Sequence, residues 1–234
     1  MKVGGTSIEI ALSAFCGSDD IITPLTPIDE LKRLDVDGGA RNYSNDPAAE
    51  RAYLNTLRKA ALSDLATLRA PTTVYYNHMP LRDVARLQNR DLSDYKVICV
   101  ERNPYAKIIS WANHKVSFDN YQIGGELKAD WQDIKRYLNE AVAQGSIAAV
   151  KNIERYRRAD GLITARVMRF DKLEEDFKQL AADLTIDFVG NLPHAKKGIL
   201  ADQVNPRDLL SRQQISLINE MFLEEFSTFG YEQL

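Results

Sequence analysis

The sequence predicts an α/β fold in which a parallel sheet is flanked by helices. Three short runs, 72–76, 95–100 and 165–170, have the β-branched, aromatic and apolar residues that are typical of strands. Longer segments with helical periodicity lie between and around these runs, and strands separated by helices form a parallel sheet with helical cover. The chain has 234 residues, of which 44% are hydrophobic and 27% charged, so we expect a single domain over 1–234.

The longest predicted helix covers 47–69, with Asp46 as its N-cap, Pro47 in its first turn and leucines along one face. The region 19–43 lacks regular periodicity and contains two prolines and a Gly-Gly pair, so we expect a long excursion over the surface. Such an excursion often covers a substrate site in α/β enzymes, and a simple surface loop is the alternative. The other predicted helices begin at Pro104 or cover 131–143 and 206–226.

Composition excludes several classes of protein. With 30 Lys and Arg against 33 Asp and Glu, the net charge is −3, so nucleic acid is not an expected partner. Cys16 and Cys99 are too few for a disulfide framework, and no Cys or His spacing indicates a metal site. No apolar run reaches the roughly 18 residues of a membrane span, and no secretory signal is present, so we expect a cytoplasmic protein without stable membrane insertion. The oligomeric state stays open.

The N-terminal segment has the chemistry of an anion-binding turn. Two glycines allow a tight turn whose N–H groups point one way, and a helix N-terminus binds phosphate or sulfate oxygens. A lysine before the glycines adds a positive charge, whereas in a Walker A motif the lysine follows them. An ordinary Gly-Gly turn capped by a hydroxyl residue is the alternative. The residues of this candidate site are Lys2, Gly4, Gly5, Thr6 and Ser7.

A second candidate site follows the apolar run 95–100. Arg102 leaves the carboxyl end of this predicted strand, where ligands bind in open α/β sheets. Ser110 lies two helical turns farther on and is expected to face the same side. An arginine fork together with a hydroxyl clamps a phosphate well. The alternative is an arginine that caps the helix and a solvated serine.

Together the two segments resemble the sulfotransferase superfamily, in its carbohydrate sulfotransferase-like branch. Lys-x-Gly-Gly-Thr-Ser at 2–7 is similar to that family's loop for the 5′-phosphosulfate of 3′-phosphoadenosine 5′-phosphosulfate (PAPS). Arg-Asn-Pro-x₅-Ser at 102–110 is similar to its 3′-phosphate motif. Segments 75–78, 167–173 and 226–231 resemble further parts of the family. In the family an apolar strand of a P-loop-like sheet precedes the lysine, and because the sequence given begins one residue before Lys2, we expect this first strand to be missing from it.

The resemblance implies a PAPS-dependent sulfotransferase that needs no metal and sulfates a hydroxyl of a glycan or glycolipid. It implies that Lys2 and the N–H groups of the following turn stabilise the leaving 5′-phosphate, and that Arg102 and Ser110 bind the 3′-phosphate. The acceptor hydroxyl must lose a proton, and His78, expected just after a strand, is the candidate base. The other candidate bases or contacts are Glu101, His114 and His194, the last in a basic loop with Lys196 and Lys197.

Two alternatives stay open. One is a nucleotide-dependent phosphotransferase of similar architecture, against which the order of lysine and glycines counts. The other is a degenerate family member that binds a nucleotide or a partner without turnover, which the missing first strand favours. Binding of the product nucleotide but not of ATP separates a sulfotransferase from a phosphotransferase.

Overall fold

A computed structural model shows a mixed α/β fold, as the sequence predicts. The chain divides into two compact units, which we call the sheet unit and the helical unit. The sheet unit comprises Met1–Val3, Lys96–Leu173 and Lys196–Leu234, and the helical unit comprises Gly4–Tyr95 and Glu174–Ala195. The structure describes residues 2–234 apart from 62, 72–73, 90–91, 123–128, 162, 164, 189 and 194–203, and for 119–122 it describes the backbone alone.

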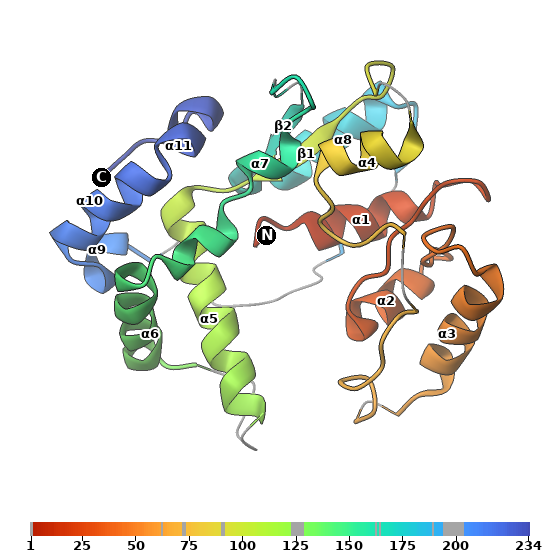
Figure 1. Ribbon diagram of the computed structural model, residues 1–234, viewed down its shortest axis with the longest axis horizontal. Helices are drawn as coiled ribbons and strands as arrows, with labels where there is room; N and C mark the ends of the chain where they lie inside the picture. Colours follow the sequence, from red (N-terminus) through yellow and green to blue (C-terminus); the bar gives the residue numbers. More distant parts are fainter. Residues whose placement is uncertain are drawn as a thin grey trace. The chain divides into compact units, whose positions relative to one another are not determined.

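The sheet unit contains a parallel pair of strands, β1 (Ile98–Glu101) and β2 (Arg166–Arg169), which run side by side in Figure 1. Their register places Ile98 opposite Arg166 and Glu101 opposite Arg169. The two predicted strands and their parallel pairing are therefore confirmed, but β1 begins at Ile98 and ends at Glu101 instead of covering 95–100, and β2 is one residue shorter at each end than the predicted 165–170. Since both strands run the same way, their carboxyl ends lie at one edge.

Helices surround this pair within the sheet unit. Of the three helices that the sequence predicts there, two match the structure closely. Asp130 caps the helix expected over 131–143, because its carboxylate accepts backbone N–H groups of the first turn. The single helix expected over 206–226 is wrong: Ser211 starts a new helix there, through a capping box with Gln214. The helical elements are α5 (Pro104–Gln122), α6 (Trp131–Ala143), η1 (Ser146–Val150), α7 (Ile153–Tyr156), η2 (Phe170–Lys172), α9 (Pro206–Leu209), α10 (Arg212–Met221) and α11 (Leu223–Phe229).

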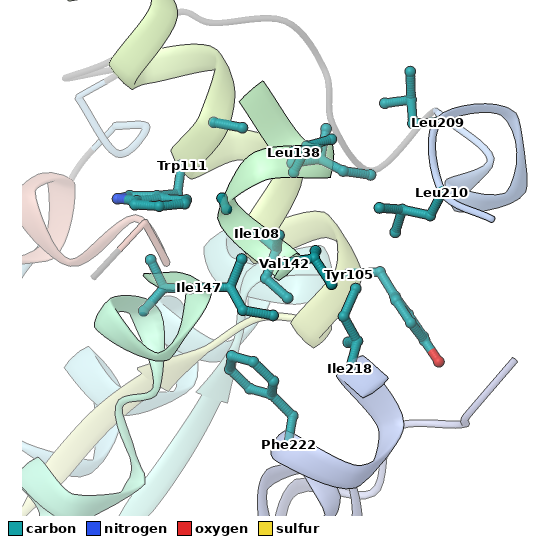
Figure 2. Packing of buried hydrophobic residues seen from close by; sticks show 14 of the residues in the cluster. Tyr105, Ile108, Trp111, Leu138, Val142, Ile147, Leu209, Leu210, Ile218 and Phe222 are labelled. Atoms are coloured by element: carbon teal, nitrogen blue, oxygen red, sulfur yellow. The ribbon is translucent and has the colours of Figure 1, made fainter. Parts of the chain in front are cut away.

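The core of the sheet unit lies where α5 meets α6, η1 and α10. Figure 2 shows side chains from these elements directed toward one another. Ile108, Leu138, Ile147 and Phe222 are each fully buried, at 0% exposure. Their burial supplies the hydrophobic stabilisation that keeps α5, and with it the turn at its N-terminus, in place.

The helical unit contains shorter helices than its sequence predicts. The helix expected over 47–69 ends at Lys59, because Ala60 takes an extended conformation. Beyond it, the N–H groups of Thr67 and Leu68 bond to the carbonyl of Asp64 and form a separate turn. The helices of this unit are α1 (Gly5–Ser13), α2 (Pro27–Leu34), α3 (Pro47–Lys59), α4 (Leu81–Gln88) and, except for its first residue, α8 (Leu173–Asp183).

The region 19–43 is more ordered than the expected excursion. It contains α2 and is held together by the buried carboxylate of Glu30. This carboxylate accepts the N–H groups of Leu25 at 2.9 Å and Ala40 at 2.8 Å, and it pairs with the buried guanidinium of Arg33. The sequence did not predict this arrangement, because the bond between Glu30 and Ala40 joins positions ten residues apart. The prolines and glycines of the region indicated an irregular loop instead.

The predicted strand at 72–76 is wrong for the residues that the structure describes. Residues 72 and 73 lie outside the described residues, 74 and 75 form a bend, and 76 is not in a strand. The N–H groups of Val74 and Tyr75 both bond to the carbonyl of Tyr43, at 2.8 and 2.9 Å. Two successive N–H groups on one acceptor turn the backbone, whereas in a strand successive N–H groups point in opposite directions.

Candidate functional site

The candidate site lies at the carboxyl ends of β1 and β2 in the sheet unit. Arg102 follows β1 directly and is only 6% exposed, while Phe170 follows β2. The guanidinium carbon of Arg102 lies 4.1 Å from the centroid of the Phe170 ring. The Nη1 atom of Arg102 lies 3.5 Å from the carbonyl oxygen of Lys2, a residue one hundred positions earlier in the chain. The structure thus brings together parts of both predicted anion-binding motifs.

The contact with Phe170 places an aromatic ring against the guanidinium of Arg102. A ring stacked on a guanidinium covers one face of the plane, and the five N–H donors lie in that plane. A guanidinium binds a phosphate through two parallel hydrogen bonds from its edge. A partly desolvated guanidinium also attracts an anion more strongly than an exposed one, because water screens it less.

A buried charge network lies immediately behind Arg102. Glu101, at 0% exposure, accepts hydrogen bonds from Lys107 Nζ at 2.9 Å and from the Arg102 N–H at 3.1 Å through Oε2. Its other oxygen, Oε1, accepts the Tyr156 hydroxyl at 2.9 Å. Lys107 is also fully buried and bonds to Glu225 Oε2 at 2.5 Å. We call these residues, Glu101, Lys107, Tyr156 and Glu225, the buried network.

The buried network determines the ionisation of Tyr156 and the role of Glu101. Burial, reinforced by the nearby Glu101 carboxylate, raises the pKa of Tyr156 well above its ordinary value, so the phenol stays a neutral donor. Glu101 is surrounded by donors and shielded from solvent. This environment suits a structural carboxylate and not the base that the sequence offered as an alternative to His78.

The N-terminal turn adopts the conformation that its glycines predict. Gly4 is the N-cap of α1, with a left-handed φ of 84°, and no side chain caps the helix. A non-glycine residue adopts this conformation only at a cost. Thr6 and Ser7 lie in the first turn of α1, where the Ser7 N–H donates to the carbonyl of Gly4 at 3.1 Å. Such a turn can bind anionic oxygens. Lys2, just before it, is also left-handed, with φ 64°.

The remaining predicted residues lie on different elements. Ser110 is half-buried on α5, and His114 is exposed farther along the same helix, where its ring lies 6.4 Å from that of Phe118. His78 is exposed in a turn of the helical unit, with φ 65°. His78 was expected to follow a strand at 72–76, and since the described residues there form no strand, that argument no longer holds for His78. His194 and the lysines beside it lie outside the described residues.

Sequence reasoning missed Phe170 and three members of the buried network. Phe170 belongs to the segment 167–173, whose resemblance to the sulfotransferase family was recognised without a role for the ring. Lys107, Tyr156 and Glu225 gave no signal, because single charged or aromatic residues on helices are usually solvated or part of the core. Their roles depend on contacts such as the one between Lys107 and Glu225, which spans 118 positions.

Two kinds of feature are absent from the described residues. Among them, no three or more His, Cys, Asp or Glu side chains gather in a way that could hold a metal ion. In the same part of the chain, no helix has the length and apolarity needed to cross a membrane.

Comparisons with known proteins give no match: no family model, no curated protein and no solved structure resembles this chain significantly. Inference about function therefore depends on the chain's own motifs and on the geometry around Arg102.

Proposed function

We propose that the chain is a PAPS-dependent sulfotransferase whose donor nucleotide binds at the carboxyl ends of β1 and β2. The observation that carries the proposal is the proximity of Arg102 to Lys2, with 3.5 Å between Nη1 and the carbonyl oxygen. Each residue belongs to a motif that resembles one half of a PAPS site. A single nucleotide can engage both motifs only if they lie close together.

The proposed donor site uses two positive groups for two phosphates. Arg102, stacked on Phe170, binds the 3′-phosphate through the edge of its guanidinium, and Ser110 adds a hydroxyl. Lys2 and the turn from Gly4 to Ser7 bind the 5′-phosphosulfate, as the resemblance implies. The P-loop-like architecture of the family is part of this proposal.

The proposed reaction is an in-line transfer between two oxygens. A bond forms between the acceptor oxygen and sulfur, and the bond between sulfur and the bridging 5′-phosphate oxygen breaks. The acceptor proton passes to a base, for which His78 remains the candidate, and 3′-phosphoadenosine 5′-phosphate (PAP) leaves. Lys2 stabilises the charge that grows on the leaving phosphate, an effect of preorganised electrostatics. A hydroxyl of a glycan or glycolipid is the proposed acceptor, and the cytoplasm is the proposed compartment.

Nucleotide binding tests the proposal. PAP is expected to raise the melting temperature of the wild-type protein, and ATP with Mg²⁺ is not. Arg102→Ala should weaken PAP binding by about 1.5–3 kcal/mol in calorimetry, the range for hydrogen bonds to charged groups. Binding of adenosine 5′-phosphosulfate, which lacks the 3′-phosphate, should weaken much less in the same variant. Arg136→Ala, at an arginine 71% exposed on α6, is the control that removes the same charge elsewhere.

Each alternative has its own result. Stabilisation by ATP and not by PAP would favour the phosphotransferase. Binding of PAP without sulfate transfer to any hydroxyl acceptor would favour a degenerate binding protein. Equal losses for PAP and adenosine 5′-phosphosulfate in Arg102→Ala would show that Arg102 does not recognise the 3′-phosphate.

A further inference from the structure

We infer that Tyr156, Lys107 and Glu225 are positioning residues for Arg102, and that they act through the carboxylate of Glu101. The inference deepens the proposed function, since it assigns to the buried network the orientation of the anion-binding guanidinium. Its geometric part concerns Arg102 itself and can be tested without any nucleotide.

The link to Arg102 is a hydrogen bond between neighbouring residues. The Arg102 N–H donates to Glu101 Oε2 at 3.1 Å, so the position of that carboxylate constrains the peptide plane from which the Arg102 side chain departs. The Tyr231 hydroxyl donates to the carbonyl of Glu101 at 3.0 Å and constrains the other side of the same peptide. The direction in which Arg102 leaves β1 therefore depends on groups bound to Glu101.

The carboxylate of Glu101 is in turn held from two helices. Lys107 on α5 bonds to Oε2 at 2.9 Å, and Tyr156 at the end of α7 bonds to Oε1 at 2.9 Å. With a different donor on each oxygen, the carboxylate plane cannot rotate without breaking a buried hydrogen bond. Such a break is costly inside a protein, where no water replaces the lost partner.

Glu225 on α11 completes the network. Its Oε2 bonds to Lys107, and its Oε1 accepts the N–H groups of Asn152 and Ile153, the latter at 3.1 Å, where α7 begins. One carboxylate thus fixes both the lysine and the helix that brings Tyr156 to Glu101. Two carboxylates and one ammonium are buried here, although a core of apolar side chains would cost less desolvation. A requirement for one orientation at the end of β1 explains this arrangement.

Tyr156→Phe is the decisive variant, because it removes one donor to Glu101 and keeps the aromatic ring. The matched control is Tyr105→Phe, which also removes a buried hydroxyl of the sheet unit. That hydroxyl bonds to Asn219 and to the N–H of Leu234 instead. The two variants are expected to lose similar stability. A difference between them in the readouts below therefore reflects the position of Arg102 and not a loss of folding.

The first readout is the nuclear magnetic resonance signal of the Arg102 Nε–H group without ligand. In the wild type, the Phe170 ring should shift this signal, and Tyr156→Phe should return it toward the value of a free arginine. The second readout is the ratio of affinities for PAP and adenosine 5′-phosphosulfate. Tyr156→Phe should lower this ratio by about tenfold, the scale of one hydrogen bond to a charged group. Tyr105→Phe should leave both readouts unchanged.

The outcomes separate the inference from the proposed function. An unchanged Arg102 signal in a folded Tyr156→Phe protein would overturn the positioning role. A wild type that binds no nucleotide would overturn the proposed function, while the resonance would still decide the positioning. If Tyr156→Phe does not fold, Glu225→Gln replaces it, since the amide oxygen can still accept the α7 N–H groups while the amide NH₂ faces Lys107. An Arg102 signal that Glu225→Gln leaves unchanged would equally overturn the inference.

Discussion

The guanidinium carbon of Arg102 lies over the ring of Phe170, 4.1 Å from the ring centroid. The two residues follow paired parallel strands, so the register of β1 and β2 brings them to the same edge. The contact holds the positive charge at the edge of the sheet where the two strands end.

Phe170→Leu should therefore weaken PAP binding by about 0.5–2 kcal/mol, the range of a cation–π contact. The melting temperature should fall only slightly, because Phe170 is half-buried. Phe170→Tyr retains a ring and is the matched control, with affinity near that of the wild type. Calorimetric titration of both variants measures the effect, and equal affinity for Phe170→Leu and Phe170→Tyr would contradict it.

Lys2→Met should lower kcat by about 10²-fold, the scale for removing one donor to a developing charge. PAP binding should weaken much less, because the effect belongs to the transition state. Lys2→Arg, which keeps the charge, should retain a larger part of the rate. Normal turnover with a raised KM in Lys2→Met would assign this residue to ground-state binding.

His78→Ala should lower turnover by about 10²–10⁴-fold if the imidazole is the base, with donor binding nearly intact. His114→Ala, at the other described histidine, should lower turnover much less. The wild-type rate should also fall on the acid side, because a protonated imidazole cannot accept the acceptor's proton. Turnover of His78→Ala above about a tenth of the wild-type rate would exclude His78 from this role.

Gly38→Ala should destabilise the protein by about 1–3 kcal/mol, the usual cost of overpacking a close contact. An added Cβ at Gly38 would lie against Ser13 Oγ and 2.9 Å from the Arg33 carbonyl oxygen. Gly17→Ala is the control, since the nearest atom to its Cβ would be Asp20 Oδ2 at 3.7 Å, an ordinary contact. Chemical denaturation compares the two, and similar stabilities would show that region 19–43 packs more loosely than described.

Tyr53→Phe should leave the free energy of unfolding at neutral pH unchanged or raise it by up to about 1 kcal/mol. The Tyr53 hydroxyl is buried and has no hydrogen-bond partner in the described part of the chain, so its removal relieves a desolvation cost. Denaturation of both proteins measures the difference. A loss above about 1 kcal/mol would show that this hydroxyl has a partner in solution.

The same variant should change the response to alkaline pH. Burial raises the pKa of Tyr53 to about 12, from 10.0. Between these values the unfolded chain loses the proton and the folded chain keeps it, so the wild type loses stability as the pH rises. The stability that the protonated Tyr53 phenol contributes is fully present below pH 10, and Tyr53→Phe lacks this dependence on pH. The variant's advantage should therefore grow above pH 10, and a constant difference from pH 8 to 11 would contradict the raised pKa.

Local chemistry in the sequence determined the elements that were predicted well. Asp130 provides an N-cap and the apolar spacing of 131–143 provides a buried face, so α6 follows from short-range preferences. Pro104 similarly marks the start of α5, and the apolar run before Arg102 marks β1. Gly4 indicated a tight turn, and only glycine adopts its left-handed conformation without strain.

Tertiary structure decided the features that join distant residues. The bend at 74–75 depends on the carbonyl of Tyr43, some thirty positions earlier, which overrides the strand preference of its residues. The stack of Phe170 on Arg102 requires the register of two strands, and the pairing of Lys107 with Glu225 requires α5 and α11 to pack. Periodicity shows which face of a helix is buried, but not what that face meets. The orientation of Arg102 is therefore a property of the folded chain, because a buried charge finds its partners only when separate elements come together.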